Sequence, residues 1–431
     1  MGKIFRRTLT ALLIVILALS AAIVGAAIKP YTATGEDYAN EVESQDIAKL
    51  RARDKAIKKA TKQAGVYLKT YSRSVNSELT DDEVTAITSN AWQLVGEPKY
   101  SSKIVTGSDE TSIIIWTATV EVNVDDSEIQ SWIKRDDKDK STIITQTREA
   151  QKASEENDRK IEDLREKYNR ATSQAEKDSL REQMTDADRD FLANQNLAEG
   201  RKLHYARNYD GAIKLYNESI KLNSKFSEAY NSRGISYYYM GQYERAIQDF
   251  DKAIYLDTNN YHAYCNRGTA YGKDLQKYDK AFNDFNVAIK INPNYYDAYL
   301  GRGVVYYYFK QYENAIQDYI KTIQLKPNYA MAYNNLGIIQ SNLKQYEQAI
   351  QNYNKAILLK PDLDLAYNNR AVAYFMLKNF KQAFDDTNKA IQLNPIYANP
   401  YYVRGLCYQK FGDNKKAQAD FAKAKELGYN G

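Results

Sequence analysis

The second half of the chain is an internal repeat, and this feature limits the fold more than any other. From Ala193 onward a pattern recurs about every 34 residues, with units beginning at residues 193, 227, 261, 296, 330, 364 and 398. The eighth position is small in every unit: Gly200, Gly234, Gly268, Gly303, Gly337, Ala371 and Gly405. The twentieth is alanine: Ala212, Ala246, Ala281, Ala315, Ala349, Ala383 and Ala417. Units of this length predict stacked helix pairs, because one pair cannot bury its apolar face alone.

The small residues and the prolines of the repeat have a physical explanation. Small side chains are needed where two helices cross closely, and a proline ends the second helix of a unit at Pro293, Pro327, Pro361 and Pro395. This pattern resembles the tetratricopeptide repeat, although Thr258 stands where the family has proline. The resemblance covers residues 193–431. It implies a mainly α fold, a solenoid of seven helix-turn-helix repeats in which the first helix of each unit faces an inner groove.

Aromatic and amide side chains recur at the positions that face this groove in the family. The chain has 38 tyrosines, most of them after Ala193. The candidate partner-binding residues are Tyr238, Tyr239, His262, Asn266, Tyr307, Tyr308, Asn335, Asn369 and Phe375. Tyrosine buries a large area at low entropic cost and asparagine both donates and accepts hydrogen bonds, so the set predicts binding of an extended peptide segment. The alternative is that the tyrosines pack between adjacent helices.

Basic residues are missing where the family uses them to grip a free C-terminal carboxylate. The fifth and ninth positions of the units from 227 to 364 hold no lysine or arginine, which favours an internal segment of a partner. Arginine instead recurs at the seventh position: Arg233, Arg267, Arg302, Arg370 and Arg404. We expect these arginines to form weak surface ion pairs with acids of neighbouring units, with a phosphate or acidic-polymer site as the alternative.

The first 28 residues predict export. Lys3, Arg6 and Arg7 precede an apolar run, so residues 1–28 are a signal peptide or an N-terminal membrane anchor formed by residues 9–28. Both alternatives place the rest of the chain in the cell envelope, outside the cytoplasm. Cys265 and Cys407 lie four units apart, so we expect buried free thiols and no disulfide.

Residues 31–135 predict a small α+β domain. Ala48, Ala52, Ala56, Ala60 and Ala64 lie on one helix face, and a stripe of small residues lets a helix lie close to a sheet. Gly65 is expected to cap this helix and residues 80–83 to form a capping box. Residues 112–124 alternate as a strand does, with residues 92–105 as its neighbour. This order resembles the N-terminal domain of exported flagellar assembly proteins and related envelope lipoproteins, and it implies an accessory envelope domain.

Residues 136–192 predict a charged helical spacer with some coiled-coil character. An apolar stripe at Ile161, Leu164, Tyr168 and Ala171 is followed by another in a different phase at Leu180, Met184, Ala187 and Phe191. A coiled coil of several heptads is therefore not sustained. A solvated spacer and a short dimerising helix remain the two interpretations.

The sequence does not favour catalysis. With two histidines and no recognised metal or nucleophile motif, no enzyme activity, cofactor or metal is expected. The net charge of +5 is mixed along the chain, so nucleic acid is not expected as a partner. The sequence thus predicts a scaffold of the bacterial cell envelope that binds a protein or peptide. The alternatives are binding of a wall or surface polysaccharide, and a role in assembling a flagellar or secretion apparatus.

Overall fold

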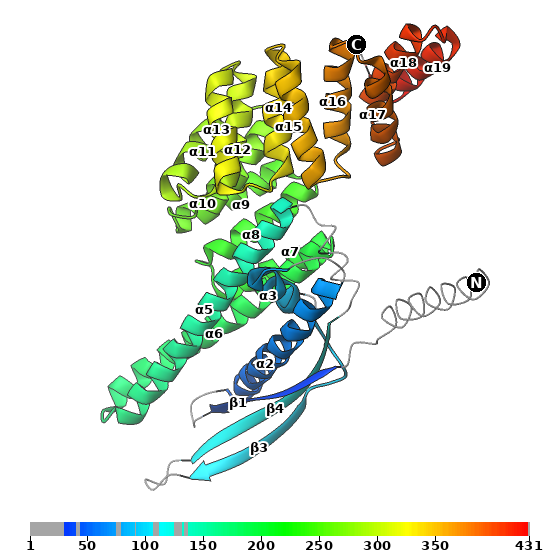
Figure 1. Ribbon diagram of the computed structural model, residues 1–431. Helices are drawn as coiled ribbons and strands as arrows, with labels where there is room; N and C mark the ends of the chain where they lie inside the picture. Colours follow the sequence, from blue (N-terminus) through cyan, green and yellow to red (C-terminus); the bar gives the residue numbers. More distant parts are fainter. Residues whose placement is uncertain are drawn as a thin grey trace, which may run out of the picture. The chain divides into compact units, whose positions relative to one another are not determined.

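The computed structural model describes residues 30–39, 44–74, 79–90, 92–106, 112–124, 132 and 137–429 (Figure 1). The chain forms two compact units, one reaching to Ala206 and including Lys221–Asn223, the other containing Arg207–Ile220 and everything from Ser224 onward. The expected signal or anchor lies outside the described residues. Among the residues that are described, no helix is long and apolar enough to cross a membrane.

The N-terminal unit contains a small antiparallel sheet. Its elements up to residue 124 are β1 (Tyr31–Ala39), α2 (Gln45–Ser74), α3 (Asp81–Asn90), β2 (Trp92–Leu94), β3 (Lys99–Thr106) and β4 (Ser112–Val124). Strand β4 is central: Ala118 pairs with Gly35 of β1 on one side and with Tyr100 of β3 on the other. The short β2 also pairs with β4. Residues 92–105 are thus the neighbours of residues 112–124, as predicted.

Helix α2 lies across β1 and β4 (Figure 1). Ala56 and Ala60 of its alanine stripe pack with Val120 and Val122 of the sheet. All five alanines of the stripe are at most 1% exposed. The approach is so close that a Cβ added to Gly35 would lie 2.3 Å from the carbonyl oxygen of Ala52 and from the nitrogen of Ala56. The predicted close packing of helix on sheet is confirmed, and Gly35 of β1 is the complementary small residue.

The prediction for the start of α3 is confirmed, whereas the prediction for the end of α2 is wrong. The capping box is present: Thr80 N donates to Glu83 Oε2 at 2.9 Å and Glu83 N donates to Thr80 Oγ1 at 3.2 Å. The prediction that Gly65 ends the first helix is wrong, because α2 continues to Ser74. Gly65 is small for another reason: a Cβ there would lie 3.1 Å from Val84 Cγ1 of α3, so the glycine makes room for a second helix.

The charged segment folds back on itself. Helices α5 (Asp137–Arg170) and α6 (Gln174–Tyr205) form a hairpin, and Ser173 caps α6 by accepting a hydrogen bond from Glu176 N. The two apolar stripes of different phase belong to these two helices and are buried against each other. The hairpin is not a solvated spacer, since Arg165 of α5 donates to Asp37 of β1 at 3.1 Å. Helix α6 also runs through the expected boundary at residues 192–193.

The second unit is a solenoid of helix pairs (Figure 1). The first helices of the pairs, here called A helices, are α8 (Ser227–Tyr239), α10 (Tyr261–Thr269), α12 (Tyr296–Tyr308), α14 (Ala330–Asn342), α16 (Asp364–Met376) and α18 (Ala398–Lys410). The B helices are α7 (Tyr209–Leu222), α9 (Tyr243–Leu256), α11 (Tyr278–Ile291), α13 (Tyr312–Leu325), α15 (Tyr346–Leu359), α17 (Phe380–Leu393) and α19 (Asn414–Glu426). The extra residue of the third unit is accommodated in a π-helical turn, η1 (Ala270–Asp274).

The predicted crossing points of the solenoid are confirmed. A Cβ added to Gly303 would lie 2.6 Å from Tyr319 Cε1, and one added to Gly337 would lie 2.6 Å from Tyr353 Cε1. The alanines at the twentieth position are buried, as Ala315 and Ala349 show at 0% exposure. Glycine and alanine are therefore present because the aromatic ring of a B helix packs directly against the A helix.

Candidate interaction face

The A helices form the inner side of the solenoid. Each of them contacts the next A helix directly, in addition to its own B helix. In a curved stack the elements nearest to one another lie on the inside of the curve. We define the inner face as the second, fifth, sixth, ninth, twelfth and thirteenth positions of the A helices, which include every candidate residue of the sequence analysis.

Asparagines of neighbouring A helices hydrogen-bond to one another along this face. Asn266 Nδ2 of α10 donates to Asn231 Oδ1 of α8 at 3.1 Å, and Asn369 Nδ2 of α16 donates to Asn334 Oδ1 of α14 at 3.0 Å. Asn335 accepts from Asn334 at 3.4 Å. The candidates Asn266, Asn335 and Asn369 are thus brought onto one face, where each is already held by a neighbouring amide.

This amide ladder continues to the last A helix. Asn368, 3% exposed, donates to Asn369 at 3.4 Å and to Tyr397 Oη at 3.0 Å, just before α18. Burial raises the pKa of Tyr397 to about 12, so its hydroxyl stays protonated near neutrality. The sixth-position amides keep one N–H and further acceptor capacity each, which is available to a chain lying across the helices.

The thirteenth-position aromatics are packed on one side and open on the other. The ring of Tyr239 stacks on Tyr209 of α7 at 5.8 Å, and the ring of Tyr308 stacks on Tyr278 of α11 at 4.5 Å. Tyr239 is nevertheless 50% exposed and Tyr308 54% exposed. Both interpretations of the sequence analysis therefore describe part of each ring: one face packs between helices and the other remains open to a partner.

The twelfth-position rings are more enclosed. Tyr238 packs edge-on against Tyr243 at 5.5 Å, and Phe375 packs against Phe380 at 5.2 Å. Tyr307 contacts the ring of Tyr312 at 6.0 Å and accepts a hydrogen bond from Asn342 Nδ2 at 3.1 Å. These rings join each A helix to the B helix that follows it and form the base beneath the more exposed tyrosines.

His262 lies among tyrosines at the second position of its unit. Its ring is 4.1 Å from that of Tyr261 and 5.0 Å from that of Tyr295. The histidine is partly buried by this packing. In the described part of the chain, no group of three or more histidine, cysteine or acidic residues could hold a metal ion.

The seventh-position arginines differ from their prediction. Arg302 Nε and Nη2 donate to Asp318 at 2.8 and 2.7 Å within the same repeat, and Nη1 donates to Asn286 of the preceding repeat at 2.7 Å. Arg302 is 20% exposed and Asp318 6% exposed. Hydrogen bonding to Asp318 raises the pKa of Arg302. Arg233, Arg370 and Arg404 repeat this arrangement, here called the arginine clamp. Arg267 repeats it with Asp251 in place of the asparagine of the preceding repeat.

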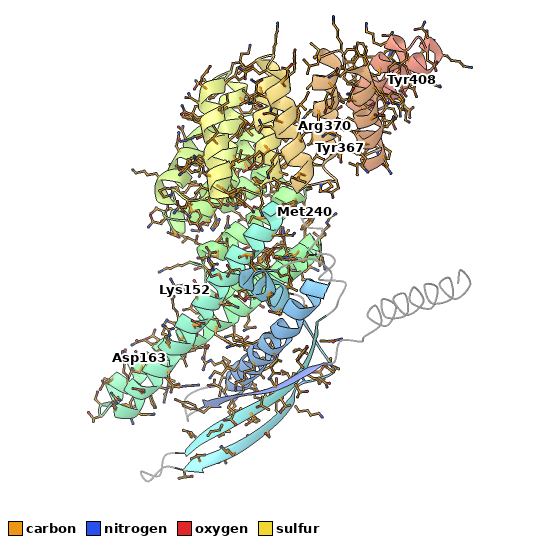
Figure 2. All side chains as sticks on the ribbon, in the orientation of Figure 1. Lys152, Asp163, Met240, Tyr367, Arg370 and Tyr408 are labelled. Carbon is orange, nitrogen blue, oxygen red and sulfur yellow. The ribbon has the colours of Figure 1, made fainter. Side chains whose placement is uncertain are left out.

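The arginine clamp is a structural tie between helices. Tyrosines three residues before and four after the arginine flank it. In the fourth of these clamps, Tyr367 lies 5.5 Å from the guanidinium of Arg370 (Figure 2). Tyr374 lies 5.9 Å from the same guanidinium. The expectation of weak pairs with acids of neighbouring units is wrong for the main partner, because that aspartate lies in the same repeat and is mostly buried. It is confirmed only for Arg267, which also pairs with the exposed Asp251 of the preceding repeat. With its donors engaged in this way, the set gives no support to a phosphate site.

Sequence reasoning missed the buried half of the amide ladder. Asn231, Asn334 and Asn368 occupy the fifth position and are 6%, 1% and 3% exposed. Their recurrence is visible in the sequence, but on its own it shows only that basic residues are absent from these positions. The signal that could have identified them is the pairing of the fifth position of one unit with the sixth of the next, about 35 residues apart in the two hydrogen bonds.

The comparisons with known proteins agree with this architecture. Models of the tetratricopeptide repeat match residues 227–260, 330–363 and 365–397, with further matches at 273–308, 310–344 and 398–427. The chain therefore contains tetratricopeptide repeats between residues 227 and 427. The matches begin at residue 227, after the first expected unit. No curated protein sequence matches the chain.

Several solved structures are similar to the chain. A tetratricopeptide repeat protein from Parabacteroides merdae is 23% identical, covering 56% of this chain and 94% of its own, with a TM-score of 0.46. MamA is 29% identical over 38% of this chain and 94% of its own, with a TM-score of 0.34. YrrB, described as having an unusual peptide-binding site, is 22% identical over 43% and 95%, with a TM-score of 0.35. Proteins of this fold are in general non-enzymatic scaffolds for protein interaction.

Proposed function

We propose that this protein is a non-enzymatic scaffold of the bacterial cell envelope and that it binds an extended segment of a partner polypeptide across its inner face. The observation that carries the proposal is the combination of half-exposed tyrosines and the amide ladder on one continuous row of A helices. Tyrosine supplies contact area, and the remaining amide groups can bond to a backbone.

The location rests on the N-terminal sequence alone. Basic residues followed by an apolar run through residue 28 support export, with cleavage or anchoring by residues 9–28 as the two forms. Dimerisation through residues 136–192 is less favoured, since Ile161 and Leu164 are 3% and 4% exposed inside the α5–α6 hairpin.

A polysaccharide remains the second candidate ligand. Its support is the open faces of Tyr239 and Tyr308, because aromatic faces also stack on sugar rings. The amide ladder favours a polypeptide. Its asparagines lie on neighbouring A helices, and each amide can donate to and accept from the N–H and C=O groups of a peptide backbone. A role in flagellar or secretion assembly rests only on the resemblance of residues 31–135.

A photo-crosslinking experiment tests the proposal. Tyr308 of the full chain is replaced in the producing cells by a photoreactive phenylalanine analogue. Tyr255, 76% exposed on helix α9, carries the same replacement as the control away from the inner face. We expect a polypeptide adduct from position 308, mapping to one short stretch of the partner, and none from position 255. Adducts of equal yield at both positions, or none at 308 beside retention on purified wall polysaccharide, would contradict it.

A further inference from the structure

From α12 to α16 the inner face is nearly free of charge, whereas Glu228 of α8 and Lys410 of α18 occupy its second and thirteenth positions. At the six inner-face positions neither α14 nor α16 carries a charged residue, and the one acid of α12, Asp297, is 6% exposed. Charged residues make up 27% of the chain, and they are plentiful on the B helices. A neutral face on A helices between charged B helices is therefore a local property, not a consequence of composition.

The amide ladder is interrupted at the middle of this face. On α12 the fifth, sixth and ninth positions are Leu300, Gly301 and Val304. Leu300 and Val304 are partly buried and pack with Tyr307 around the core of α13 and α14. These side chains make no hydrogen bonds, so an apolar surface separates the pair Asn231–Asn266 from the pair Asn334–Asn369.

Packing beneath α12 maintains the interruption. A Cβ added to Gly301 would lie 2.4 Å from Cζ of Phe285, whose ring is 3% exposed. An asparagine at this position would have to displace a buried ring of α11. The sixth position of α12 thus cannot continue the amide ladder without repacking the repeat.

We infer that the inner face selects a neutral extended polypeptide segment with a bulky apolar side chain over Leu300 and Val304, flanked on both sides by residues whose backbone faces the amides. This inference rests on the proposed function and specifies its partner. A charged side chain on the partner would lose its hydration against α14 and α16 without gaining a counter-charge. An apolar side chain over α12 has no charge to desolvate and buries apolar area.

The spacing of the helices sets the length of the segment. Neighbouring packed helices lie about 8–10 Å apart, and an extended chain advances about 3.3 Å per residue. One A helix is therefore crossed by about three residues. A segment from α10 to α14 with its apolar residue over α12 is about seven residues long.

The test uses the full chain and a displayed library of random peptides of about twelve residues. We expect enriched peptides that are neutral with one bulky apolar residue near the middle. Their affinity should change less than about twofold between low and high salt, because no exposed charge pair is formed. Leu300→Asn should reduce binding by about tenfold, whereas Ile320→Asn, which changes a 42% exposed residue of α13 away from the inner face, should not.

A second variant tests neutrality directly. Val372→Lys places one charge on the inner face of α16, and the same library should then yield acidic peptides whose binding weakens with salt. Circular dichroism verifies that all variants remain helical. If the unchanged protein selects charged peptides, and these peptides no longer bind the Leu300→Asn variant, the inference is overturned and the proposed function stays intact. Peptides insensitive to both inner-face variants, or no enriched peptide, would overturn the proposed function as well.

Discussion

Asp37 is the residue on which the buried charges of the N-terminal unit converge. Its carboxylate, on a side chain that is 1% exposed, lies 3.1 Å from Arg165 Nη1, 3.1 Å from Lys55 Nζ and 3.8 Å from Arg51 Nη1. Burial alone would raise the pKa of Asp37, but Arg165 and the other two cations outweigh burial and lower it. One aspartate thus fixes β1 to both α2 and α5.

Asp37→Asn should destabilise the N-terminal unit by about 3–5 kcal/mol, because Arg165 and Arg51, 2% and 3% exposed, would keep their charges without this partner. Urea denaturation followed by circular dichroism measures the change. Since the folded pKa is lowered, the stability from Asp37 is present above its ordinary pKa and is lost as the pH falls through the folded value. The variant should therefore lose less stability than the native protein in that acidic window.

The matched control removes both charges. Asp37→Asn combined with Arg165→Met should be more stable than Asp37→Asn alone, because the buried guanidinium that has lost the Asp37 carboxylate is gone. If the double variant shows the sum of the two single effects, the carboxylate and the guanidinium do not act as a pair.

At the scale of elements, the fifth repeat lacks the arginine clamp as a set. Leu336 of α14 replaces the arginine, Asn352 of α15 the aspartate, and Ile320 of α13 the asparagine of the preceding repeat. Leu336 packs with the core around Tyr319. Asn352 donates instead to Gln340 Oε1 at 2.7 Å, so in this repeat an apolar contact of Leu336 and an amide bond stand where the other repeats have the clamp.

When the clamp is restored in the fifth repeat, the effects of the three substitutions on the free energy of unfolding should be strongly non-additive. Leu336→Arg alone places a guanidinium in a partly buried site without a carboxylate and should cost about 2–4 kcal/mol. Adding Asn352→Asp and Ile320→Asn should recover most of that loss, because the two bonding partners return. Chemical denaturation of the single and triple variants measures the coupling. A triple variant no more stable than Leu336→Arg would show that the clamp needs more than these three residues.

Local patterns in the sequence were sufficient to predict most helices and strands, but they did not predict the contacts between residues far apart in the chain. The capping box at Thr80 and the alanine stripe of α2 depend on neighbours in the chain, and both were predicted. The change of apolar phase near Ala171 marked the α5–α6 hairpin, but no glycine or proline indicated the turn. Asp37 and Arg165 are 128 residues apart, and nothing local indicates such a pair.

The sequence predicted which positions lie on the candidate site, but it did not predict the hydrogen bonds between their side chains. A period of about 34 residues places Asn266 and Asn369 on one face, which is why periodicity found them. Periodicity does not say whether an amide meets a ligand or its neighbour. Asn231 and Asn334 receive these amides in the structure, because neighbouring A helices are close enough for side chains of adjacent repeats to meet.

At the scale of the whole solenoid, the reactivity of two buried cysteines can be used to measure the order in which the repeats unfold. Cys265 of α10 is 4% exposed and Cys407 of α18 is 0% exposed, and neither forms a disulfide, as predicted. Burial raises the pKa of Cys407 to about 11, so in the folded state little reactive thiolate forms near neutral pH. Each thiol therefore reacts after its own repeat opens.

The last repeat should open first. Helix α18 has A-helix contact only with α16, whereas α10 contacts both α8 and α12, and in a linear array stability depends on nearest-neighbour interfaces. With rising urea, Cys407 should react with a thiol reagent at lower denaturant than Cys265, measured in the variants Cys265→Ala and Cys407→Ala. Circular dichroism of both variants controls for altered stability. Coincident reaction midpoints would instead mean that the solenoid unfolds as one cooperative unit, in which the end repeat is held as firmly as those inside.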